Sequence, residues 1–182
     1  MTRIAVILAF AIAACDVGSV VSNNQGGPDG SIGGGADGSG GGSGSGSNCD
    51  ALSTNLPDGH HNAGQACMQG GCHLIGNTGG ANVPAFAYGG TLYRDSAGTN
   101  PYPGATIEVT IGGQTKKMVT GSNGNFYITS TLASPPTAAM TATTKASACP
   151  STTPMSGALV DNGGNCNNCH KTGGTTTPIY LQ

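Results

Sequence analysis

The stretch from Val17 to Asn48 limits what this chain can fold into more than any other feature. It reads VGSVVSNNQGGPDGSIGGGADGSGGGSGSGSN, and such a segment cannot bury enough apolar surface to offset the entropy lost on ordering it. We therefore expect residues 15–48 to form a disordered tether, which spans roughly 30 Å if it behaves as a Gly/Ser random coil. Residues 49–182 remain, and they suffice for one domain with a modest core.

The residues ahead of the tether have the features of an export signal. Arg3 supplies positive charge, Ile4–Ala14 form a short apolar run, and small residues end it, so residues 1–14 are predicted to be a signal peptide. No apolar run reaches the ~18–20 residues of a membrane-spanning helix. Six basic and eight acidic residues give a net charge of −2. Without a stripe of Lys and Arg to meet phosphates, no nucleic-acid partner is expected.

Residues 84–147 predict an antiparallel β-sandwich. Short segments rich in β-branched and aromatic residues alternate with turn signals such as Ser122-Asn123-Gly124, and this spacing favours a sandwich over a βαβ unit. No segment has helical periodicity over three turns. The expected strands are Ala85–Tyr93, Thr106–Ile111, Lys116–Thr120 and Asn125–Thr129, with Met140–Thr144 as a candidate fifth.

The segment Cys166-Asn167-Asn168-Cys169-His170 has the C-x-x-C-H pattern that attaches c-type haem. Cys166 and Cys169 are spaced to reach the two vinyl groups of one porphyrin, and His170 is then placed to bind the iron. A thioredoxin-like redox motif would be expected near a βαβ pattern, which is absent here. A plain disulfide would not need the histidine.

An earlier segment, Cys67-Met68-Gln69-Gly70-Gly71-Cys72-His73, has a related C-x4-C-H pattern that is two residues longer. Its glycine pair permits the extra residues to bulge outward at little steric cost. We expect Cys67 and Cys72 to attach a second haem and His73 to bind its iron. The alternative is a disulfide hairpin beside an incidental histidine.

Two further histidines, His60 and His61, match the number of axial ligands that remain to be found. Neighbouring residues of an extended segment point to opposite sides, which suits ligands of two different haems. We therefore predict bis-histidine ligation. Met155 is the alternative distal ligand, and histidine–methionine ligation would raise the redox potential. Met68, Met118 and Met140 are also available.

Cys49 and Cys149 are left over once both haems are assigned, and in an oxidising compartment we expect them to form a disulfide. It would close a loop of about 100 residues around the sandwich. The flanking segments 49–83 and 148–182 are poor in large apolar residues. We therefore assign them to haem binding and expect them to be loose without the cofactor.

Several of these segments also resemble known families. Ile12-Ala13-Ala14-Cys15 resembles the lipobox of bacterial lipoproteins, which implies that Cys15 carries lipid and anchors the chain to a membrane. Asp16 resembles an inner-membrane retention signal of some bacteria, so the choice of membrane stays open. The runs Gly90–Tyr93, Pro103–Val109 and Val119–Phe126 resemble the transthyretin-like, carboxypeptidase-regulatory-like β-sandwich.

As a whole, the chain resembles exported, multihaem-like c-type cytochromes of deltaproteobacterial type. The residues that carry this resemblance are the lipobox, the tether, GHHNAGQACMQGGCH and GGNCNNCH. The resemblance implies a lipid-anchored protein of the periplasm, outer membrane or cell surface, but it names no redox partner.

The leading functional prediction is a dihaem electron carrier and not an enzyme, because two axial ligands leave the iron no open position. One alternative is a structural or adhesive lipoprotein in which the cysteines form three disulfides. Another is a structural zinc site at Cys67, Cys72, Cys166 and Cys169, although an oxidising compartment disfavours zinc thiolates. Hydrolase chemistry has little support, since the chain has one glutamate, Glu108, and no G-x-S-x-G turn.

Overall fold

The computed structural model describes residues 49–57, 61–111, 113–131, 142–155 and 164–182. The predicted signal peptide, the tether with Cys15, and His60 lie outside these ranges. The described part is mainly β and consists largely of antiparallel sheets, consistent with the predicted β-sandwich.

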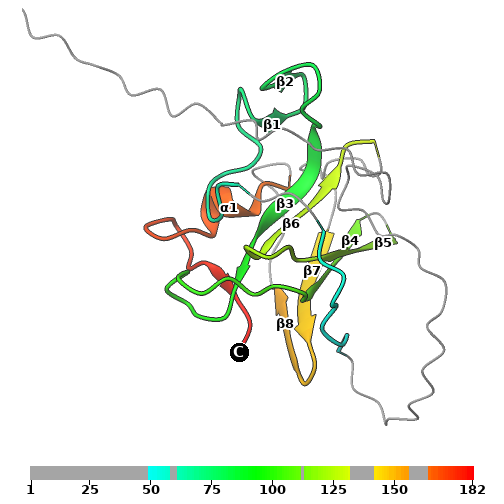
Figure 1. Ribbon diagram of the computed structural model, residues 1–182, viewed down its shortest axis with the longest axis vertical. Coiled ribbons are helices and arrows are strands. Elements are labelled where there is room, and N and C mark those ends of the chain that lie inside the picture. Colours follow the sequence, from blue (N-terminus) through cyan, green and yellow to red (C-terminus); the bar gives the residue numbers. More distant parts are fainter. Residues whose placement is uncertain (1–48, 58–60, 112, 132–141, 156–163) are drawn as a thin grey trace, which may run out of the picture.

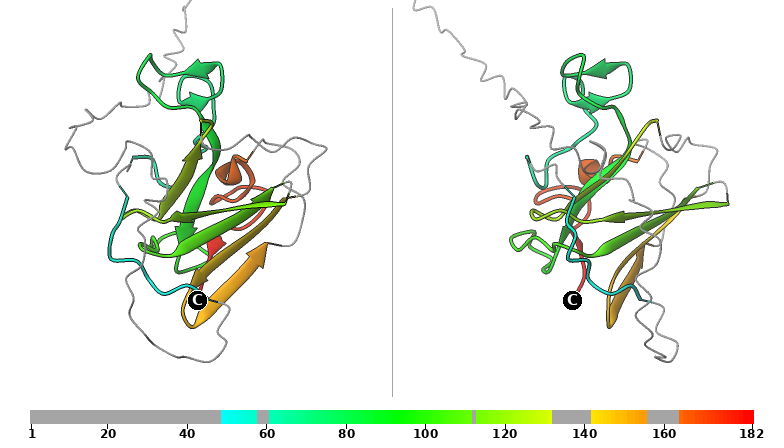
Figure 2. Two further views of the ribbon diagram at one scale, coloured as in Figure 1. Left: turned by 90° about the vertical axis from the view of Figure 1, so that its right-hand side faces the viewer. Right: turned by 45° about the vertical axis from the view of Figure 1, so that its right-hand side comes forward.

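Two sheets form the body of the protein, and their strands cross one another in the two views of Figure 2. The four-stranded sheet has the order β5-β4-β7-β8 and is antiparallel throughout. The three-stranded sheet has the order β6-β3-β9, in which β9 runs parallel to β3. A small hairpin, β1-β2, stands apart from both. The strands are β1 His73–Leu74, β2 Asn77–Thr78, β3 Phe86–Tyr93, β4 Thr106–Ile111, β5 Gln114–Val119, β6 Asn125–Thr129, β7 Ala142–Ala148, β8 Ser151–Met155 and β9 Ile179–Tyr180.

The observed strands agree closely with the predicted ones in the middle of the chain. β4 and β6 have the predicted bounds, and β3 begins one residue later than predicted. β5 is shifted toward the N-terminus because it pairs residue by residue with β4 across a tight turn. β7 runs further toward the C-terminus than the candidate strand over 140–144, whose first two residues are outside the described ranges. β8 and β9 were not predicted.

The core lies between the two sheets and follows the alternation of their strands. Tyr88, Leu92 and Phe126 face inward from the three-stranded sheet, and Ile107 and Met118 face them from the other. Burying a large apolar side chain contributes about 1.5–3 kcal/mol, so these residues dominate the stability of the sandwich. Met118 is 1% exposed and packs within this core.

Strand β3 is buried at all eight positions, which is unusual for an antiparallel strand with one face toward solvent. Its inner face packs in the core. The edge of β3 that lies away from β6 is covered in part by the segment that leads into α1 (Cys166–Cys169), where the Gly89 amide donates to the Gly164 carbonyl at 3.0 Å. Further along the same edge, the Leu181 amide donates to the Tyr93 carbonyl at 3.0 Å. The segment of the first motif also contacts β3, since the Gly64 amide donates to Thr91 Oγ1 at 2.9 Å. Both segments that carry the cysteine–histidine motifs are therefore anchored at this strand (Figure 1).

Candidate functional site

The C-x4-C-H segment forms a closed loop despite its two extra residues. The His73 amide donates to the Cys67 carbonyl at 3.1 Å, and the Cys72 amide donates to the Gln69 carbonyl at 3.0 Å. Gly71 adopts φ +79°, a conformation that favours glycine, and its Cα faces open space. The glycine thus lets the extra residues bulge outward while the two ends of the motif stay together.

The C-x-x-C-H segment has the same closure. Its cysteines begin and end the single turn α1, and the His170 amide donates to the Cys166 carbonyl at 2.9 Å. In both motifs, therefore, the amide of the histidine bonds to the carbonyl of the first cysteine. The difference of two residues is absorbed between the cysteines.

The similarity continues beyond the histidines. In each motif the carbonyl of the second cysteine accepts a hydrogen bond from the amide seven residues further along. The Gly79 amide donates to Cys72 at 3.0 Å, and the Thr176 amide donates to Cys169 at 3.2 Å. The two motifs therefore share this pattern of backbone hydrogen bonds as well as the related spacing of their cysteines and histidine.

Both motif histidines have their rings fixed through Nδ1. His73 Nδ1 lies 2.8 Å from the Pro84 carbonyl, and His170 Nδ1 lies 2.9 Å from the Thr177 carbonyl. Because a carbonyl only accepts, each Nδ1 must donate the hydrogen, and in the neutral form of such a ring the lone pair lies on Nε2. This is the arrangement in which proteins present histidine to a metal.

His73 also lies in a row of aromatic rings. Its ring stacks on Phe86, with centres 3.8 Å apart and planes at 5°, and Phe86 stacks on Tyr127 at 4.5 Å. Burial lowers the pKa of His73 and the nearby His61 lowers it further, which outweighs the opposite effect of the Pro84 carbonyl. The neutral ring, which is the ligand form, is thus favoured at neutral pH.

Among the predicted distal ligands, the structure brings His61 to the first motif. The His61 and His73 ring centres are 5.8 Å apart, with planes at 27°. His60 and Met140 are outside the described residues. Met155 is the last residue of β8. Met68 is buried.

The motif cysteines differ in whether they are disulfide-bonded and in the pKa of their thiols. Cys67 and Cys166 are free thiols, whereas Cys72 is disulfide-bonded. Burial raises the pKa of Cys67 to about 11 and that of Cys166 to about 12. Buried thiols of this kind are poor nucleophiles, because the thiolate is the reactive form.

In the described part of the chain, no three or more His, Cys, Asp and Glu side chains gather as they would to hold a metal ion. Cys67, Cys72, Cys166 and Cys169 therefore do not form the tetrahedral group that the zinc hypothesis requires. A haem iron takes only two axial ligands from the protein, so this finding does not bear on haem.

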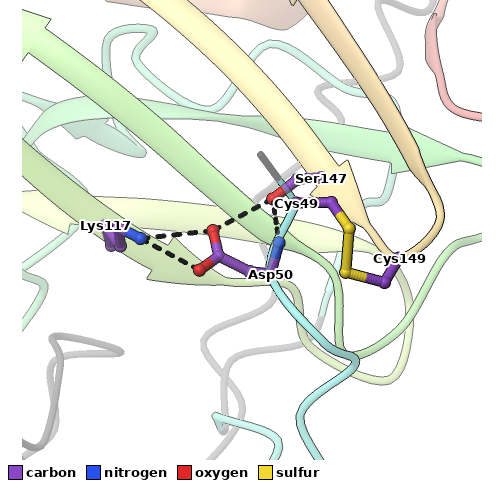
Figure 3. The surroundings of a disulfide bond; sticks show 5 residues. All are labelled: Cys49, Asp50, Lys117, Ser147 and Cys149. Carbon is purple, nitrogen blue, oxygen red and sulfur yellow. Dashed lines mark hydrogen bonds and ion pairs between the residues drawn. A yellow bond between two sulfur atoms is a disulfide. The ribbon is translucent and has the colours of Figure 1, made fainter. Parts of the chain in front are cut away.

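Cys49 and Cys149 form a disulfide at one end of the four-stranded sheet (Figure 3). Asp50 accepts hydrogen bonds from Lys117 Nζ at 3.0 Å and from Ser147 Oγ at 3.0 Å. Burial raises the pKa of Asp50, but these two hydrogen bonds and the lysine charge outweigh it, and the net pKa is lowered. The first described residues are thereby fixed to β5 and β7.

Sequence reasoning missed the polar residues that hold the two motifs on the three-stranded sheet, namely Thr91, Asn125 and Asn167. Thr91 and Asn167 are fully buried, and each contacts residues from more than one segment. Only the position of Asn167 between the two cysteines of the second motif could have marked it as a candidate in the sequence.

Within the described ranges, no helix is long and apolar enough to cross a membrane. Comparison with protein-family models, with curated proteins and with solved structures found no match to this chain.

Proposed function

We propose that this chain is an exported, lipid-anchored c-type cytochrome that carries two haems and transfers electrons. The observation that carries the proposal is the shared state of His73 and His170. Each follows a pair of cysteines, and each is tied through Nδ1 to a backbone carbonyl, so that the neutral ring would offer Nε2 to iron. A disulfide or zinc site would need neither histidine in this state.

In this proposal Cys67 and Cys72 hold one haem, and Cys166 and Cys169 hold the other. Each thioether forms by addition of a thiol S–H across a vinyl double bond, so no atom is lost and no oxidant is needed. Cys72 must first be released from its disulfide by a dithiol reductant, which supplies two electrons. Because Cys166 is buried and Cys67 is half-buried in the folded protein, we place attachment before the motifs dock on the sandwich.

The proximal ligands are His73 and His170, and His61 is the distal partner of His73. His61 is assigned this role because its ring centre lies 5.8 Å from that of His73. His60, or Met155 in its place, is then left for the second iron. When bound, haem supplies a one-electron couple.

The sandwich is a scaffold in this proposal, since both motifs are anchored on β3. We assign it to the transthyretin-like, carboxypeptidase-regulatory-like type on the glycine and proline pattern between Gly90 and Phe126. Lipid on Cys15 would hold it at the periplasmic side of a membrane or at the cell surface, and the Cys49–Cys149 disulfide is compatible with export.

The test is haem stoichiometry after export from a cell with c-type maturation machinery. The full chain should carry two covalent haems in a pyridine haemochrome assay. C67A/C72A and C166A/C169A should each carry one. C49S/C149S is the matched cysteine control and should keep both. A wild-type chain with no haem would refute the proposal.

The second candidate is a structural or adhesive lipoprotein with a disulfide-stapled sandwich. The Cys49–Cys149 bridge and the disulfide at Cys72 favour it. A haem-free exported protein whose cysteines resist alkylation until they are reduced would support this candidate instead.

A further inference from the structure

Asn167 lies inside the second motif and is fully buried. Both the oxygen and the nitrogen of its side-chain amide form hydrogen bonds. Its Oδ1 accepts from the Thr91 amide at 2.9 Å. Its Nδ2 donates to the Gln65 carbonyl at 2.8 Å and to Thr91 Oγ1 at 2.9 Å. An amide nitrogen has two hydrogens to donate, so the donating capacity of Asn167 is complete.

Thr91, on β3, extends this contact into the first motif. Its hydroxyl accepts from the Gly64 amide at 2.9 Å and donates to Asn125 Oδ1 at 2.7 Å. Asn125 Nδ2 in turn donates to the His61 carbonyl at 2.9 Å. A continuous chain of hydrogen bonds therefore runs from the second motif through the strand to the backbone of residues 61–65.

The side-chain oxygen of Asn167 also accepts a backbone hydrogen bond from β3 that a carbonyl of a neighbouring strand would normally accept. The Thr91 amide points to the edge of β3 that lies away from β6, between the bonds that Gly89 and Tyr93 make there. A buried amide without a partner is costly, and a fully satisfied polar network fixes one arrangement more strictly than apolar packing. One side chain thus closes the strand edge and binds the other motif.

We propose that Asn167 is a positioning residue that locks the first cysteine–histidine motif onto the second, so that the two haems are held as one pair at a fixed separation. The inference rests on the proposed function. It goes beyond haem attachment, because the C-x-x-C-H pattern itself requires no particular residue at this position.

The test compares Asn167→Asp with Asn168→Ala in the full, haem-loaded chain. Asn167→Asp keeps the shape and the acceptor for the Thr91 amide but loses both donors. Asn168 is the exposed neighbour in the same motif, so Asn168→Ala is the matched control. Thr91→Val is a second variant that removes the bridging hydroxyl and suits a buried strand, should Asn167→Asp fail to fold.

Two readouts are needed. Hydrogen exchange of the amides in residues 61–67 should be about tenfold or more faster in Asn167→Asp than in wild type, because at least two buried hydrogen bonds are lost. In a redox titration, the two reduction steps of wild type should differ from those of the single-haem variants C67A/C72A and C166A/C169A. In Asn167→Asp they should move toward the single-haem values, while haem content stays at two. Asn168→Ala should resemble wild type in both readouts.

The proposal is overturned if exchange in residues 61–67 is unchanged, if it rises equally across the whole sandwich, or if the redox steps of Asn167→Asp match those of wild type. A wild-type chain without haem would refute the proposed function instead. In that case the exchange result alone decides whether Asn167 holds the two segments together.

Discussion

Removal of the disulfide between Cys49 and Cys149 should destabilise the protein more than loss of any single surface contact. The two cysteines are 100 residues apart in the sequence. In the chain-entropy model, a bridge over a loop of about 100 residues contributes about 4.7 kcal/mol by restricting the unfolded chain. At about 3 °C per kcal/mol for a domain of this size, the variant C49S/C149S should melt roughly 15 °C below wild type.

The assay is thermal and urea unfolding of both proteins, with and without reductant. The reductant should lower the stability of wild type toward that of C49S/C149S, and in the variant it acts only on the disulfide at Cys72. Asp50 keeps its bonds to Lys117 and Ser147 in the variant, so the folded arrangement near residue 50 should persist. A difference below about 1 kcal/mol would refute the reasoning, because the closed loop would then not restrict the unfolded chain as the model requires.

Three further predictions concern single groups. In haem-free protein at pH 8, iodoacetamide should label Cys67 at least about 100-fold more slowly in the folded protein than in urea. The reason is that burial raises the pKa of Cys67 from 9.0 to about 11. Equal labelling rates, measured by mass spectrometry, would contradict this. The Thr99 amide is foremost among the hydrogen-bond donors that lower the pKa of Asp95 to about 2. Its folded pKa is below the unfolded one, so the loop that it holds should be intact above about pH 4 and loosen as the pH falls through about 2; an NMR titration with a midpoint near 4 would show otherwise. Gly64→Ala should lose more than the about 1–2 kcal/mol that the left-handed backbone alone costs in urea unfolding, because Gly64 has φ +77° and a Cβ would also lie 2.6 Å from Tyr93 Oη. Gly71→Ala, at φ +79° in open space, is the control for the backbone alone, and equal losses in the two variants would exclude the steric contribution.

Much of the sandwich could be predicted because its strands are local patterns. β4 and β6 are rich in β-branched and aromatic residues between clear turn signals, and both were predicted with their observed bounds. β8 was missed because Ser151–Met155 is polar and contains a proline, so it lacks the composition of a strand. It pairs with β7 as an edge strand, where composition constrains little.

The cysteine–histidine motifs could be found from spacing, but their arrangement could not. Nothing local in the sequence indicates that Gln65 and Asn167, 102 residues apart, share a hydrogen bond. The run AFAYGGTLY did contain a usable signal. It has apolar or glycine residues on both faces of β3, which is typical of a strand covered on both sides.

The way α1 closes the edge of β3 has a consequence for solubility. If Gly164–Cys169 left the strand, the amides of Gly89 and Thr91 would lose their partners on a strand that is otherwise buried throughout. Such an edge is a ready template for the same edge of another copy, and repeated pairing of this kind leads to aggregates. The segment that we assign to haem therefore also keeps molecules of this protein apart, and chains that fail to dock it should collect as insoluble material.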